Sequence, residues 1–397
     1  MASNTSKCWR ARWLAVHLYL GLSVGMVMSV VGVTGSVMAF WQTYDAWLNP
    51  QLFTVAALEA GRAGPAPAEL VAAAERALPA NAKLTALYFP CWQRDRAVLT
   101  ARYRLADASE HELYLDPNVG TLKGSRLVAD SSAPWRAPAL EVIVQLHQSL
   151  LLAAAGEHIV AVSALLAMVS LATGFWLWWP KPGKWRSALL LQPKASAQRR
   201  IYDLHKLNGA YAGLLVLLMV VTGVVMYEPE GLWIKALAGT LSPLQKPADD
   251  LRSASVPSGK PITAAEAVAI VDRLAPGGQF NWMHVPQQPD GVFEIVKVRS
   301  ANGTGNQLKL MLDQYSGKEL WRYDYSQASG GDKFLAWLYP LHAGYGLGLL
   351  GRLTVGLTGL ALPILFATGL SRRLQKRRTN SHSDPASPPN QLGSSNT

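Results

Sequence analysis

Two stretches of the chain decide the fold: HLYLGLSVGMVMSVVGVTG at residues 17–35 and HKLNGAYAGLLVLLMVVTG at residues 205–223. Each begins with a histidine, has a glycine four residues later, and ends in a Thr-Gly pair at offsets of seventeen and eighteen, with no gap between the two copies. Both are long apolar runs whose ionisable side chains stand at the start, His17 in the first and His205 with Lys206 in the second. The match indicates an internal duplication, which is the first property to look for in a new sequence.

A second pair of segments repeats in the same way. In each, a Leu-His dipeptide is followed by a glycine nine residues after the histidine and by a Thr-Gly pair at offsets of twenty-six and twenty-seven. The chain is therefore predicted to consist of two similar halves. The matching residues are His147, Gly156, Thr173 and Gly174 in the first half, and His342, Gly351, Thr368 and Gly369 in the second.

Four apolar runs are long enough to cross a bilayer as helices, which takes about 20 residues. Half of the 397 residues are hydrophobic and only 16% are charged, a composition typical of membrane proteins. The first run exceeds the apolar core of an ordinary signal peptide, so we expect it to be retained, although residues 37–39 resemble a cleavage site. The runs are 14–40, 159–179, 207–227 and 353–370.

The net charge of +11 is concentrated in three short segments beside these runs. Three basic residues precede the first run, seven lie in 181–206 and five in 372–378, against only Asp203 and Asp384. By the positive-inside rule, both termini and the 180–206 loop face the cytoplasm. The rest of the chain is almost neutral, so the charge indicates topology, and we expect no nucleic-acid partner.

Two segments of about a hundred residues each are thereby placed outside the cytoplasmic membrane, in the periplasm of a Gram-negative cell. In both, a helix (67–78 and 263–274) precedes short strands and a turn, DPNVG at 116–120 and DQYSG at 313–317. The predicted fold class is a membrane α-helical bundle of four transmembrane helices with two periplasmic α+β modules, the order span, module, span occurring twice. The predicted segments are a cytoplasmic N-terminus at 1–13, the first span at 14–40, the first module at 41–145, a preceding helix with the second span at 146–179, a cytoplasmic loop at 180–206, the third span at 207–227, the second module at 228–340, a preceding helix with the fourth span at 341–371, and a basic end with a disordered tail at 372–397.

The duplicated histidines are the candidate site. Equivalent positions beside a pseudo-twofold axis along the membrane normal can face each other, which pairs His17 with His205 near the cytoplasmic face and His147 with His342 near the outer face. Two imidazoles are too few for a closed zinc site. With only Cys8 and Cys91, the chain has no four-thiolate centre and no C-x-x-C-H haem attachment. Two axial imidazoles suit b-type haem, so we expect two bis-histidine haems held in a helical bundle.

Other residues near the spans have weaker functional signals. The glycines of the spans, such as Gly21 and Gly209, either admit a flat cofactor or simply pack helices. Arg352 either pairs with a haem propionate or lies at the membrane interface. We expect an interfacial position for His158, exposed positions for His111 and His284, and a disordered location for His382 in the tail.

In their order and spacing these motifs resemble the PepSY-associated transmembrane family, which includes inner-membrane ferric-siderophore reductases of the ferrioxamine reductase type. The resemblance covers roughly residues 10–373. It rests on the H-x-x-x-G and T-G motifs of the spans, LHQSL at 146–150, TGFWLWWP at 173–180, DLHKLNG at 203–209, LHAGYG at 341–346, and LNP at 48–50.

The resemblance implies a bacterial inner-membrane oxidoreductase that passes electrons through two b haems to a periplasmic ferric siderophore and releases Fe(II) for iron uptake. By motif position its haem ligands are His17, His205, His147 and His342. No Rossmann or flavin fingerprint is present, so the expected electron donor is a quinol or a cytoplasmic reductase. Two other hypotheses stay open: a membrane-anchored PepSY binding or regulatory protein, and a transporter of siderophore or metal.

Overall fold

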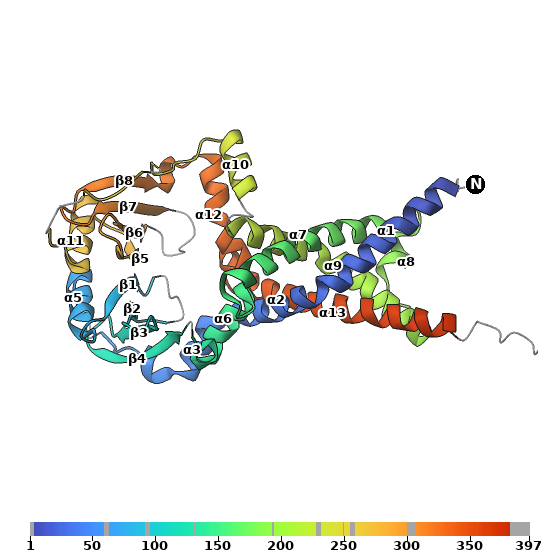
Figure 1. Ribbon diagram of the computed structural model, residues 1–397, viewed down its shortest axis with the longest axis horizontal. Helices are drawn as coiled ribbons and strands as arrows, with labels where there is room; N and C mark the ends of the chain where they lie inside the picture. Colours follow the sequence, from blue (N-terminus) through green and yellow to red (C-terminus); the bar gives the residue numbers. More distant parts are fainter. Residues whose placement is uncertain are drawn as a thin grey trace, which may run out of the picture.

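The computed structural model consists of a long helical bundle joined at one end to a β-sheet domain (Figure 1). The N-terminus lies at the end of the bundle far from the sheet. The structure describes residues 4–58, 63–91, 96–130, 132–192, 194–227, 232–248, 250–254, 259–299 and 306–381.

Three helices of the bundle are long and apolar enough to cross a membrane. A fourth element consists of α1 and α2, which are separated by a break around Val24 and bent by 54° relative to each other. It is long and apolar enough to cross a membrane only if the two helices count as one span. The number of spans is therefore three or four, and the four-span duplication stays a prediction. The structure thus differs from the prediction here: the first span was expected to be one continuous helix, and the element is broken. The bundle helices are α1 (Asn4–Ser23), α2 (Gly25–Met38), α7 (Ala153–Trp178), α9 (Ala197–Met226) and α13 (Gly348–Ser381).

Side-chain size follows the expected pattern of a membrane bundle. The buried positions of α7 are small residues, among them Gly156, Ala164 and Ala167, whereas large apolar side chains such as Leu214 and Leu357 are exposed on the outside of the bundle. Small residues at the interface let helices approach closely, and leucine on the outside matches the hydrocarbon of a bilayer.

Within the described residues, the soluble domain contains one antiparallel sheet of eight strands in the order β4-β3-β2-β1-β5-β6-β7-β8. The two predicted modules therefore share a sheet instead of folding separately, because β1 pairs with β5 and places Leu87 opposite Met283. Joining the modules in this way removes one edge from each of them. The strands are β1 (Lys83–Tyr88), β2 (Leu99–Arg104), β3 (Glu110–Leu115), β4 (Leu122–Ala129), β5 (Gln279–His284), β6 (Val292–Val298), β7 (Gln307–Asp313) and β8 (Glu319–Asp324).

Helices α5 (Pro67–Ala77) and α11 (Ala264–Leu274) cover the face of the sheet that points away from the bundle (Figure 1). Thr263 caps α11 by accepting a hydrogen bond from the amide of Glu266, whose carboxylate accepts from the amide of Thr263. Apolar residues of the six inner strands, such as Leu87 and Leu310, pack beneath these helices and form one core common to both halves.

Short helices connect the bundle to the sheet and close the loops. Two of them, α6 and α12, lie at the end of the bundle nearest the sheet (Figure 1). At the C-terminus, α13 continues to Ser381, beyond the predicted end of the span, and the rest of the predicted tail, with His382, lies outside the described residues. The short helices are α3 (Trp41–Leu48), α4 (Pro50–Phe53), α6 (Ala139–Ser149), α8 (Trp185–Leu189), α10 (Leu232–Leu241) and α12 (Gly330–His342), with 3-10 turns η1 (Pro134–Arg136), η2 (Tyr325–Gln327) and η3 (Tyr345–Leu347).

Candidate functional site: two facing histidine pairs

The four duplicated histidines lie in two pairs. His17 on α1 faces His205 on α9, with ring centres 6.2 Å apart and planes inclined by 76°. We call these two residues the distal pair, because they lie towards the end of the bundle far from the sheet. His147 on α6 faces His342 on α12 with ring centres 6.3 Å apart and planes inclined by 62°. We call these two residues the proximal pair.

Each histidine is oriented by a hydrogen bond from its Nδ1 to another helix. His17 Nδ1 lies 2.9 Å from the carbonyl oxygen of Ser170, and His147 Nδ1 lies 2.9 Å from that of Val31. A carbonyl oxygen only accepts, so Nδ1 must carry the proton, and in the neutral ring Nε2 is then left with a free lone pair.

The second half repeats this arrangement. His205 Nδ1 lies 3.1 Å from the carbonyl oxygen of Leu365, and the backbone of Met219 is a hydrogen-bond partner of His342. In all four cases the contacted backbone residue lies three positions before the threonine of a Thr-Gly pair.

The Thr-Gly pairs therefore hold the histidines. The Thr222 hydroxyl lies 3.0 Å from His342 Nδ1 and donates to the carbonyl of Met219. Its oxygen is thus available to accept from the ring, as a second partner of the Nδ1 proton. Equivalent hydroxyl contacts join Thr34 to His147 at 3.2 Å, Thr173 to His17 at 3.4 Å and Thr368 to His205 at 2.9 Å.

The glycine of each pair makes room for the imidazole. A β-carbon at Gly35 would lie only 2.9 Å from Cε1 of His147, and one at Gly174 would lie 2.9 Å from Cε1 of His17. The roles predicted for the span glycines, cofactor access or helix packing, did not include this one. The signal that could have revealed it is the fixed spacing between histidine and Thr-Gly pair in both halves.

Gly21 and Gly209, four residues after the distal histidines, have a different environment. A β-carbon there would meet nothing closer than 3.7 Å, from Ser170 Oγ and Leu365 respectively. These two glycines are therefore not required by close helix contact.

The spacing of the rings suits two ligands on opposite sides of one metal ion. A metal–imidazole bond of about 2 Å, with the nitrogen about 1 Å from the ring centre, places two trans imidazoles about 6 Å apart. All four rings are half-buried. The described residues contain no group of three or more His, Cys, Asp or Glu side chains arranged for a metal ion, so each pair could supply two protein ligands and no more.

The other residues considered near the spans or in the modules each contact other protein residues. Arg352 donates from Nε to the carbonyl oxygen of Ala39 at 2.7 Å and from its guanidinium to Thr43 at 2.6 Å, which joins the start of α13 to the end of α2. His158 lies with its ring centre 6.0 Å from that of Tyr227. His111 contacts Ser109, and His284 contacts Glu294.

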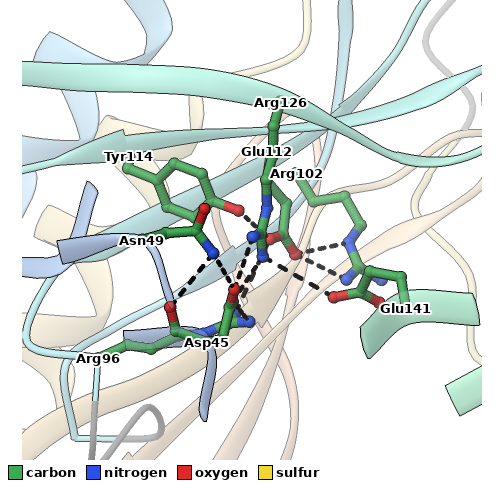
Figure 2. Close-up of polar contacts among 8 residues, drawn as sticks. All are labelled: Asp45, Asn49, Arg96, Arg102, Glu112, Tyr114, Arg126 and Glu141. Atoms are coloured by element: carbon green, nitrogen blue, oxygen red, sulfur yellow. Dashed lines mark hydrogen bonds and ion pairs between the residues drawn. The ribbon is translucent and has the colours of Figure 1, made fainter. Parts of the chain in front are cut away.

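A buried cluster of charged residues, shown in Figure 2, was missed by the sequence analysis. The Asp45 carboxylate, on α3, contacts both Arg96 and Arg126, with Arg126 making two hydrogen bonds of 2.7 and 2.6 Å. Arg102 pairs with Glu112 at 2.7 Å, and Tyr114 donates to Glu112 at 2.7 Å. Because these residues come from separate segments of the chain, no local sequence motif predicts the cluster.

This cluster links α3, the sheet and α6, which is one of the two helices of the proximal pair. Glu141, on the same helix as His147, lies 4.0 Å from Arg126. Burial, reinforced by the charge of Glu112, raises the pKa of Glu141. Burial also opposes ionisation of Glu112, but Arg102 and Arg96 outweigh it and hold the pKa of Glu112 below its usual value.

The fold and the site define a membrane protein with a soluble α+β part and two facing pairs of helix-held histidines. The family model described as PepSY-associated TM region matches residues 14–376, and the chain belongs to this family. A search of curated proteins found no match.

Proposed function

We propose that this protein is a di-haem b electron-transfer protein of the bacterial inner membrane that reduces ferric siderophores in the periplasm and releases Fe(II). The proposal rests on two pairs of histidines in which the two imidazole rings face each other. The Nδ1 proton of each ring is hydrogen-bonded, and its Nε2 lone pair is free.

The residues present fit b-type haem as a cofactor. His17 and His205 would hold one haem and His147 and His342 the other, because each pair offers two unprotonated ring nitrogens and the ring centres lie 6.2 and 6.3 Å apart in the two pairs. Helix bundles commonly hold cofactors between facing helices. When bound, haem supplies one-electron redox chemistry at its iron.

The contribution of the chain is to fix the ligands. A histidine that donates its Nδ1 proton is held in one tautomer and becomes a more basic ligand. The Thr-Gly pairs provide this contact from helices that do not carry the histidine concerned. The ring orientation is therefore fixed by packing between helices rather than by one local segment.

The positive-inside distribution of charge supports an orientation with both termini in the cytoplasm. In that orientation the distal pair lies near the cytoplasmic side, where a quinol or a cytoplasmic reductase would donate electrons. The sheet and the proximal pair lie on the periplasmic side, where a ferric siderophore would accept them.

The test is a pyridine haemochrome assay and a reduced-minus-oxidised spectrum of detergent-purified protein, expressed with ample haem. Two b haems per chain are expected. The His17→Ala and His147→Ala variants should each lose one haem, whereas the matched control His158→Ala should keep both. Wild-type protein without haem would refute the proposal and favour the membrane-anchored PepSY binding or regulatory protein.

A protein with two haems is then offered a ferric siderophore and a chemical reductant. Siderophore-dependent reoxidation of the haem, with Fe(II) captured by a chromogenic chelator, is expected. Haem reoxidation without any ferric chelate in the reaction, or no response to ferric chelates, would remove the siderophore from the proposal while leaving electron transfer intact.

A further inference from the structure

A basic cavity of about 270 Å³ lies where α7 ends and α9 begins, under the short helix α8. Its walls include four cations and two aromatic rings. A larger hollow of about 770 Å³ continues along the same loop and adds Arg186 and Lys194. The cations and aromatic residues that line the smaller cavity are Trp178, Lys181, Lys184, Arg199, Tyr202 and Lys206.

Three donors in this cavity lack an acceptor among the described residues. The indole Nε1 of Trp178 is buried without a hydrogen-bond partner. Neither Lys181 nor Lys184 forms an ion pair within the described part of the chain, and both are exposed. A buried N–H without a partner costs free energy, and a ligand with acceptor oxygens would relieve that cost.

The carboxylate nearest to these groups is already engaged. Asp203 is fully buried and binds Arg199 at 3.2 Å and Lys206 at 3.0 Å. It also accepts a hydrogen bond of 3.4 Å from the backbone of Gln192, which holds the loop against α9. One acid among four bases leaves the cavity with an excess of positive charge.

The walls of the cavity are apolar on the bundle side. The ring of Trp178 packs against Trp185 on α8, with ring centres 5.9 Å apart, and Tyr202 lies beneath the Arg199 guanidinium at 5.1 Å. Tryptophan and tyrosine beside lysine and arginine at the end of a span are typical of the headgroup region of a membrane. A ligand that fits such walls has an anionic group and an apolar part.

We infer that this cavity binds the phosphate headgroup of an anionic phospholipid on the cytoplasmic side of the membrane. Lys181, Lys184 and the Trp178 indole would contact the phosphate oxygens. Because Lys206 directly follows His205, a bound headgroup also holds the loop against the helix that carries one distal histidine. The inference depends on the membrane location of the family and is independent of haem.

The test is native mass spectrometry of the full-length protein in detergent, titrated with phosphatidylglycerol, with phosphatidylcholine as the zwitterionic control. The Lys181→Gln/Lys184→Gln variant is expected to bind phosphatidylglycerol about 30-fold more weakly, since each basic residue near an anionic surface contributes roughly fivefold. Trp178→Phe keeps the ring and removes the N–H, and should bind about 10-fold more weakly.

The matched control is Lys7→Gln/Lys376→Gln, which removes two exposed charges from the same end of the bundle but outside the cavity. It should keep wild-type affinity. Equal weakening in both double variants, or no weakening in either, would overturn the inference, because the attraction would then be non-specific or absent. Displacement of the lipid by millimolar inorganic phosphate would also overturn it, since the ligand would then be a soluble phosphate.

Discussion

Replacing Gly35 by Ala tests whether the Thr-Gly pairs position the histidines that we propose as haem ligands. The added methyl would lie 3.3 Å from Nδ1 of His147 and 2.9 Å from its Cε1, and the latter distance is shorter than β-carbon contacts in proteins. The imidazole can move away only by lengthening its 2.9 Å hydrogen bond to the carbonyl of Val31. The substitution should therefore displace one ligand while leaving all four histidines in the chain.

The size of the effect follows from three contributions. Overpacking costs about 1–3 kcal/mol, and a weakened hydrogen bond costs about 1 kcal/mol. Alanine in place of glycine inside a helix returns about 1 kcal/mol. Changes in groups that orient a metal ligand typically reduce metal affinity by about 10–100-fold. We therefore expect the haem affinity of the proximal pair to fall by about 10–100-fold and that of the distal pair to stay unchanged.

The four glycines form a graded series for the assay, in which each variant is titrated with haem and its redox spectrum is recorded. The closest approach of the added methyl is 2.9 Å at Gly174, 3.1 Å at Gly223 and 3.5 Å at Gly369. Gly174→Ala should match Gly35→Ala in size but affect the distal pair, and Gly369→Ala should be almost neutral. Equal effects at all four glycines, or a loss at the wrong pair, would refute the reasoning.

Three further predictions concern other parts of the molecule. Asp45→Ala should lower the free energy of unfolding by about 3–5 kcal/mol, because two arginines lose the buried carboxylate that they share. Urea unfolding measures this difference. The control Asp290→Ala, which breaks an exposed ion pair, should lower the free energy of unfolding by less than about 1 kcal/mol. Glu294, whose pKa is lowered to about 2 because its basic neighbours outweigh burial, should stabilise the sheet above about pH 4.5 and lose that contribution as the pH falls towards 2. In thermal unfolding, Glu294→Gln should therefore be less stable than wild type at pH 7 by about 1–2 kcal/mol, and an equal difference at pH 2 would contradict the assignment. His147→Gln should change the spectrum and midpoint potential of one haem only, and a shift of both would show that the pairs are not separate sites.

Much of the fold was readable because hydrophobic runs and turn residues act locally. The helix at 67–78 and the turn DPNVG, for example, are encoded by proline, acidic first-turn residues and Asp-x-x-x-Gly spacing. Strands are predicted near 83–89, 98–105, 111–116, 293–299 and 307–312, which correspond to β1, β2, β3, β6 and β7, whereas β4, β5 and β8 were not predicted. Two of them, β4 and β8, are edge strands with few fully buried positions, so their residues lack a strong alternating pattern.

The bend in the first bundle element and the shared sheet also depend on distant residues. Gly25, at the break between α1 and α2, packs against Phe366 of α13, which no local pattern around residue 24 can indicate. The pairing of β1 with β5 joins segments almost two hundred residues apart. Such contacts form only when the two halves assemble.

The repeated motif spacing, the apolar runs and the four histidines can be read from the chain alone, because periodicity and spacing are properties of the sequence. Only the tertiary structure decided which helix orients which ring. Each Thr-Gly pair holds the histidine of another helix, and the charged cluster around Asp45 unites α3, the sheet and α6. A hydrogen bond between helices depends on packing in three dimensions, so the repeated spacing of the histidines and the Thr-Gly pairs does not by itself show which pair contacts which ring.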